Sequence, residues 1–189
     1  MDFLAIFVVN GWLYSVCYPE HKIGGEPADI IKILFDRWTD PEYLLEFFKR
    51  HASDLANVFW KGITIDQAIK QVLGEVERLE ELLWAIETKQ PGYEDKTFRD
   101  VFKPLHKNIY SLNWNNEQFR KARPDLPDSM LRIYAIELGD GSFVITGGVI
   151  KLTEKMVGDQ FEIEIKNLNR VRDYLRNEGI SDKVGLEAI

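Results

Sequence analysis

Hydrophobic residues recur along the chain with two different periods, and these periods predict a mixture of strands and helices. Near the start, Phe3–Val9 and Trp12–Tyr18 are rich in aromatic and β-branched residues, and the intervening Asn10-Gly11 is typical of a type I′ turn. Two similar runs, Met130–Leu138 and Ser142–Ile150, flank a short glycine-containing turn. The sequence therefore predicts two β-hairpins, one at the start and one in the second half of the chain.

Apolar residues at helical spacing dominate the region between the hairpins. Ala28–Trp38 has this spacing and predicts a first helix. A second helix is expected to begin with Thr39 as its N-cap, because Pro41 and Glu42 follow it at positions that favour a helix start. Its apolar face continues to Leu55.

The clearest helical pattern, Ile65–Ile86, follows the capping box Thr64-Ile65-Asp66-Gln67. An apolar stripe runs along one side of this helix, and the other side carries Glu75, Glu77, Arg78, Glu80 and Glu81. We expect the charged side to be solvated. A last amphipathic helix is predicted over Asp159–Asn177, with Gly179 just beyond its end.

These elements predict an α+β fold in which a small antiparallel sheet packs against several helices. Residues 1–62 are expected to form an N-terminal hairpin and helical extension, and residues 63–189 an α+β domain. One continuous domain is the alternative, because 189 residues suit a single domain. The polar, proline-containing segment Asn113–Asp128 is expected to be a connection.

Charge and cysteine content narrow the expected functions. The net charge of −7 disfavours general nucleic-acid binding, although residues 97–135 hold seven Lys and Arg against four Asp and Glu and could form a local basic patch. The single cysteine, Cys17, excludes an internal disulfide, and the three histidines lack zinc-ligand spacing, so we expect no metal and no cofactor. No apolar run has the length of a membrane span, and we expect a cytoplasmic location.

Candidate chemistry gathers around the second hairpin. Arg132 and Tyr134 are two residues apart and would point to the same face of a regular strand. Further candidates lie after the next strand and upstream of the hairpin: Lys151, Lys155, Arg99, Lys103, His106 and Lys107. The cations could hold an RNA backbone, and Tyr134 or His106 could transfer a proton. Two alternatives stay open, because Arg132 could pair with Glu137 or an acidic helix, and Tyr134 could be an ordinary sheet aromatic.

Gly147-Gly148 follows a strand and so suggests a phosphate-binding loop. The surrounding residues lack the glycine and lysine spacing of such a loop. A strand distortion where the backbone must pass closely is the favoured interpretation.

Several segments follow one another in the order of a known family. They are Phe98–Leu105, Leu131-Arg132-Ile133-Tyr134, Phe143–Thr153 and a helix with Arg170-Val171-Arg172. From Ile65 to Asn177 this order resembles the RelE/HigB-like toxins of type II toxin–antitoxin systems, including their phage-derived branch. The segments Leu131–Ile136 and Val144–Thr153 are also similar to the core of a group of uncharacterised Bacteroidetes-type proteins.

The toxin resemblance implies ribosome-dependent mRNA cleavage without a metal, in which the 2′-OH attacks the adjacent phosphate and cations stabilise the developing charge. Arg132 would match the strand arginine of the family, and Lys151 or Lys155 the lysines after the last strand. The implied partners are mRNA on the ribosome and a helix-turn-helix antitoxin, with a homo-oligomer as a further option. A non-catalytic protein-interaction module is the alternative function, and an acidic mimic of nucleic acid is a third.

Overall fold

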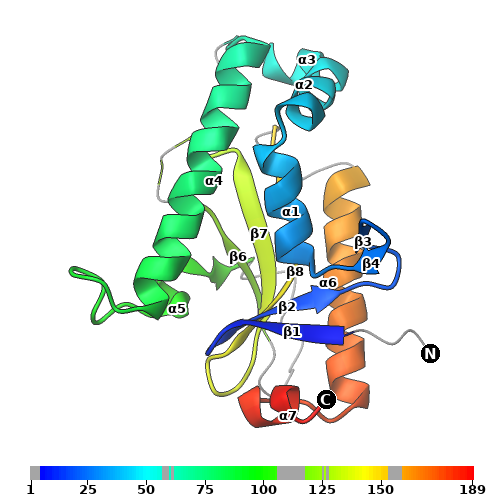
Figure 1. Cartoon of the computed structure of the whole chain (residues 1–189), viewed down its shortest axis with the longest axis vertical. Helices are drawn as coiled ribbons and strands as arrows, with labels where there is room; N and C mark the ends of the chain where they lie inside the picture. Colours follow the sequence, from blue (N-terminus) through cyan, green and yellow to red (C-terminus); the bar gives the residue numbers. More distant parts are fainter. Residues whose placement is uncertain are drawn as a thin grey trace.

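The structure is a computed structural model, and it describes residues 5–56, 60, 62–105, 118–124, 126, 128–152 and 159–189. Helices and strands in these ranges are shown in Figure 1. The strands are β1 (Ala5–Asn10), β2 (Leu13–Cys17), β3 (Lys22–Ile23), β4 (Glu26–Pro27), β5 (Lys103–Pro104), β6 (Gln118–Ala122), β7 (Leu131–Glu137) and β8 (Phe143–Ile150). The helices are α1 (Ile30–Thr39), α2 (Pro41–Arg50), α3 (Ala52–Leu55), α4 (Ile65–Glu87), α5 (Phe98–Val101), α6 (Asp159–Asn177) and α7 (Lys183–Glu187).

Six of the strands form one mixed sheet in the order β1-β2-β8-β7-β6-β5. Neighbours are antiparallel except β2 and β8, which pair in parallel from Leu13 opposite Phe143 to Ser15 opposite Ile145. The N-terminal hairpin therefore belongs to the same sheet as the C-terminal strands. The predicted α+β class is confirmed, but the sheet is mixed and not purely antiparallel.

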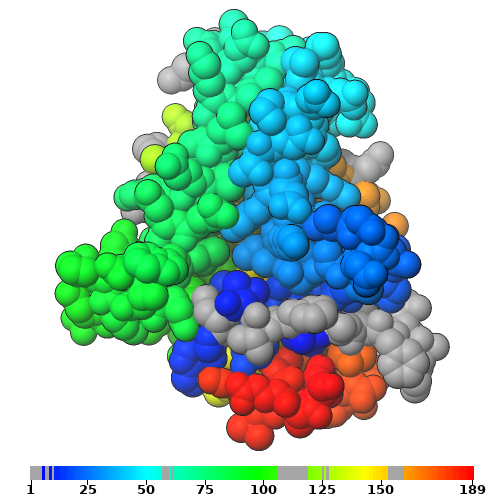
Figure 2. Space-filling model, viewed as in Figure 1, coloured from blue at the N-terminus to red at the C-terminus, as the bar shows by residue number. Residues whose placement is uncertain are grey.

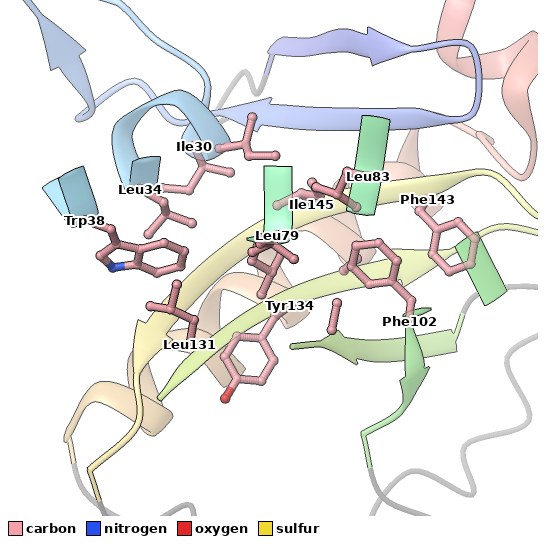
Figure 3. Close-up of a cluster of buried hydrophobic side chains, with 14 of the residues drawn as sticks. Ile30, Leu34, Trp38, Leu79, Leu83, Phe102, Leu131, Tyr134, Phe143 and Ile145 are labelled. Carbon is pink, nitrogen blue, oxygen red and sulfur yellow. The ribbon is translucent and has the colours of Figure 1, made fainter. Parts of the chain in front are cut away.

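The two faces of this sheet are covered by different helices. On one face, Leu131 of β7 and Ile145 of β8 pack with Trp38 of α1 and Leu79 of α4, as Figure 3 shows. In Figure 2, α4 and α1 lie in front of much of β7 and β8. The opposite face is covered by α6, which contacts both β7 and β8. Side chains on alternate positions of these strands thus enter two separate environments.

The strongest sequence patterns are confirmed by the structure. Both predicted hairpins are present as the antiparallel pairs β1–β2 and β7–β8, and the predicted helices at 28–38, 65–86 and 159–177 correspond to α1, α4 and α6. The capping box of α4 has both of its hydrogen bonds. Gln67 N donates to Thr64 Oγ1 at 3.2 Å, and Thr64 N donates to Gln67 Oε1 at 2.8 Å.

Two predicted local details were wrong. In the first hairpin Asn10 pairs with Leu13, so the turn consists of Gly11 and Trp12. Gly11 lacks the positive φ that a type I′ turn requires. At the second helix, Thr39 ends α1 by donating to Phe35 O at 2.7 Å, and Asp40 is the N-cap of α2.

Other differences concern elements without a strong local signal. The predicted connection over Asn113–Asp128 contains strand β6, and α7 follows the predicted last helix. The second helix is interrupted at His51, which separates α2 from α3. Within the described part of the chain, none of the helices combines the length and apolar character needed to cross a membrane.

Glu75 contradicts the expectation that its side of α4 is solvated. Its side chain is buried with 1% of its surface exposed, and it accepts four hydrogen bonds at 2.8 Å. The donors are Gln71 Nε2, Ser129 Oγ, Met130 N and Leu131 N. The carboxylate of Glu75 therefore accepts hydrogen bonds from the backbone N–H groups at the start of β7, a role that a neighbouring strand usually has.

Candidate nucleic-acid interface

Lys121, Arg123 and Arg132 form a basic cluster on the sheet face that α6 covers, near the start of β7. Lys121 of β6 lies opposite Tyr134 of β7. Continuing the same register by two residues places Arg123 opposite Arg132. Directly opposite and diagonal positions on one face are within roughly 8 Å of each other, so the three cations are neighbours.

The charges of the basic cluster repel one another. Burial lowers the pKa of Lys121, and the positive charges of Arg132 and Arg123 lower it further. Burial and Arg123 likewise lower the pKa of Arg132, with Glu75 opposing this effect. The ion pairs within the described ranges leave all three cations without a carboxylate partner. An anion bound here would relieve this repulsion.

Arg132 is held in place by the chain segment that precedes β7. Its Nη1 atom donates to Leu131 O at 2.6 Å and to Ser129 O at 2.9 Å. Ser129 in turn donates to Glu75. All the hydrogen bonds of the guanidinium to described residues leave from Nη1, so Nε and Nη2 are the donors that a phosphate could use.

Lys151 lies on the same face as the basic cluster. Its N–H donates to Met130 O at 2.7 Å, which extends the β7–β8 ladder by one pair. Val149 is opposite Arg132, and alternation from Val149 places Lys151 on the same side of the sheet. Lys151 is half-buried. Of the two lysines predicted after β8, it is the one within the described residues, and it lies on the same face of the sheet as Arg132.

Tyr134 shares the face of Arg132, as its spacing predicted, but the structure removes it from the candidate catalytic residues. Its side chain is fully buried, and Figure 3 draws it among the buried side chains of the core. Burial raises the pKa of its hydroxyl, and the nearby Glu164 raises it further. A hydroxyl that is enclosed and hard to ionise cannot exchange a proton with an RNA on the surface.

Arg99 is separate from the basic cluster, whereas Lys103 of β5 lies directly opposite Lys121 of β6 and is therefore next to the cluster. Arg99 and Arg120 both form ion pairs with the buried Glu137, Arg120 at 2.6 Å. Glu137 is thereby the partner of these two residues and not of Arg132. Lys103 turns its ammonium group toward Arg99 O at 3.3 Å. The predicted RNA contact of Arg99 thus lies at a different place from Arg132, whereas that of Lys103 lies beside Lys121.

The predictions for His106, Lys107 and Lys155 fall outside the described residues. Lys121 and Arg123 were part of the predicted basic segment but were not singled out. The missing signal was strand β6, since only its pairing with β7 shows that these two cations lie beside Arg132.

Glu164 of α6 was not predicted as a special residue, although it interrupts the apolar stripe of that helix. Its side chain is 6% exposed, and burial raises the pKa of the carboxyl to about 8, while a side-chain hydrogen bond from Asn167 opposes this. It packs against Gly147, where a Cβ would be 1.9 Å from Glu164 Oε2. The favoured interpretation of Gly147 as a point of close approach agrees with this contact.

Gly147→Ala is expected to destabilise the protein by about 1–3 kcal/mol, because the new methyl group forces a buried carboxylate to move. Gly74→Ala is the matched control, since Gly74 lies on the exposed side of α4 with no neighbour within 4 Å of the added Cβ. That control should stabilise the protein by about 0.5–1 kcal/mol. Urea unfolding measures both, and equal effects of the two substitutions would contradict the close packing at Gly147.

Compared with models of protein families, with curated proteins and with solved structures, the chain shows no match.

Proposed function

We propose that this protein is a toxin-like RNA-binding protein that holds single-stranded mRNA through the basic cluster and cleaves it. The observation that carries the proposal is the grouping of Lys121, Arg123 and Arg132 on one face without a carboxylate partner among the described residues. Lys121 and Arg132 are half-buried and Arg123 is exposed, and neighbouring cations that repel one another gain most from a ligand with several negative charges. An RNA backbone is such a ligand.

In the proposed cleavage, the 2′-OH attacks the adjacent phosphorus and the 5′-oxygen leaves. Negative charge develops on the phosphate oxygens, and Arg132 and Lys151 lie on the face where they would stabilise it. Tyr134 takes no part because it is buried. His106 stays the acid/base prediction.

RNA binding is expected to depend on salt and on the basic cluster. Three phosphate contacts give a slope of about −2 when the logarithm of the association constant is plotted against that of salt concentration, since each contact contributes roughly 0.7 for a single strand. Lys121→Ala and Arg123→Ala should each reduce the slope by about 0.7. Fluorescence anisotropy with a labelled single-stranded RNA measures this.

Arg78→Ala is the control for this experiment. Arg78 is an exposed arginine on α4 that pairs with Glu81. Its replacement removes one positive charge, as Arg123→Ala does, but at a position away from the basic cluster. An equal loss in the control and in Arg123→Ala would show that only the overall charge matters. That result would refute the proposed interface.

Cleavage is tested separately by induced expression with a translation readout. Growth arrest and broken mRNA are expected for the natural chain, and Arg132→Ala combined with Lys151→Ala should abolish both. Normal growth with intact mRNA would refute the enzymatic part. A short adjacent reading frame for a helix-turn-helix protein would support an antitoxin partner.

A second candidate function is a non-catalytic interaction module with the same fold. The enclosed ring of Tyr134 favours it, because one predicted proton donor is out of reach. This alternative predicts RNA-independent growth effects or none, and no change in mRNA after induction.

A further inference from the structure

A cavity of about 160 Å³ lies beside β8, at the end of the strand that β2 does not cover. Its walls come from α1, α2, β8 and α6. Trp38, Tyr43 and Phe47 contribute aromatic rings, and Ile150 contributes the strand side. This cavity is distinct from the basic cluster, because its lining includes none of the three cations of that cluster.

One buried carboxyl group lines this cavity. Glu164 is 94% buried, and its Oε2 atom has no hydrogen-bond partner within the described structure. A buried polar atom without a partner is costly. Gly147 leaves room for the carboxyl group of Glu164, since any side chain at residue 147 would collide with it.

The uncovered edge of β8 adds backbone carbonyl acceptors together with backbone N–H donors. Lys151 N points to β7, where it donates to Met130 O. Backbone groups alternate in direction along an antiparallel strand, so both the carbonyl and the N–H groups of Gly148 and Ile150 point away from β7. Both residues line the cavity.

The dimensions and the chemistry of the cavity indicate one class of ligand. Its volume equals that of roughly five water molecules at about 30 Å³ each. Carboxylate and carbonyl oxygens accept hydrogen bonds from an ammonium group, and aromatic rings attract a cation and pack against its methylene groups. Arg37 is the one cation among the lining residues, and its side chain is exposed.

We propose that this cavity binds a short primary alkylammonium group, with Glu164 as its ionic partner and Trp38, Tyr43 and Phe47 around its alkyl chain. The ligand class includes free amines and the side chain of a lysine. The site is independent of RNA binding by the basic cluster.

Three probes of equal length and different charge test the proposal: butylammonium chloride, 1-butanol and sodium butyrate. Nuclear magnetic resonance of the full chain follows the indole N–H of Trp38 and the amide of Gly148 during titration at pH 8.5. Saturable binding of butylammonium is expected, at least tenfold tighter than that of either other probe. Equal or tighter binding of 1-butanol or butyrate would overturn the proposal, as would the absence of saturation at about 10 mM of the amine, ten times a Kd of about 1 mM.

Two variants assign the effect to the carboxyl group. Glu164→Gln keeps the shape of the side chain and should weaken butylammonium binding at least tenfold. Glu162→Gln removes the same charge from an exposed position on α6 and should leave binding unchanged. Undiminished binding by Glu164→Gln, or an equal loss in Glu162→Gln, would overturn the assignment, and the comparison of the three probes on the natural chain stands whether or not the variant folds.

Discussion

Glu75→Ala is expected to destabilise the protein by about 3–5 kcal/mol. The substitution leaves Met130 N and Leu131 N, both on fully buried residues, without the carboxylate oxygens they donate to at 2.8 Å. Each buried N–H that loses its partner costs about 1–3 kcal/mol, and the cavity left by the carboxyl group adds to this. A domain of this size has a total stability of roughly 5–15 kcal/mol, so the loss should be visible in urea or thermal unfolding.

The control for this prediction is Glu80→Ala on the same helix. Glu80 is exposed, and its replacement should change the free energy of unfolding by less than about 0.5 kcal/mol. Hydrogen exchange adds a local measurement, because the amide of Leu131 should lose protection in Glu75→Ala before the amides of α6 do. If Glu75→Ala lowers the free energy of unfolding by less than about 1 kcal/mol, the role of Glu75 at the start of β7 is contradicted.

The same substitution links stability to the proposed interface. Glu75 accepts from Ser129 Oγ, and Ser129 O accepts from Arg132 Nη1. Removing the carboxylate frees this segment, so Arg132 should lose its fixed orientation. Weaker RNA binding by folded Glu75→Ala at low temperature is the expected consequence.

Local patterns in the sequence are sufficient to predict most of the helices and both hairpins. The capping box at Thr64 and the apolar stripe that follows specify α4 without reference to any other element. The parallel pairing of β2 with β8 could not be predicted, because it joins residues 13–15 to residues 143–145. Nothing within either strand indicates which distant strand lies beside it.

Strand β6 was missed for a different reason. Its sequence, Gln-Phe-Arg-Lys-Ala, is mostly polar, so it lacks the alternation that predicts a half-buried strand. Pairing with β7 makes it a strand. Lys121 belongs to this strand and Arg123 follows it. The sequence shows each cation, but only the pairing of β6 with β7 brings them together as the basic cluster.

The two buried glutamates occupy positions that the helical periodicity of the sequence assigns to the core side of their helices. Glu75 lies three residues after Val72 and four before Leu79, and Glu164 lies four before Leu168. Both therefore occupy the apolar stripe of their helix. A carboxylate in such a stripe is expected to have a specific partner or a specific function. The expectation of a solvated Glu75 came from the charged residues that follow it in the sequence.

Raising the pH from about 4.5 to about 8 is expected to destabilise the protein through Glu164. Burial raises the pKa of this carboxyl from 4.5 to about 8, so between these values the folded state keeps a proton that the unfolded state releases. Stability falls with pH wherever the folded state binds more protons. The full effect is about 4–5 kcal/mol, from roughly 1.4 kcal/mol per pKa unit.

The difference in unfolding free energy between the natural chain and Glu164→Gln isolates this effect, because other titrating groups are common to both. Those groups include His21, whose lowered pKa gives the opposite trend. Tyr18 and Tyr134 have raised pKa values and do not titrate in this range. The two proteins should be similar in stability at pH 4, and the variant should be more stable by several kcal/mol at pH 8.5. A difference that does not change with pH would contradict a buried, neutral Glu164. Since an alkylammonium ion requires the ionised carboxyl group, butylammonium should restore part of the lost stability at pH 8.5 and none at pH 4.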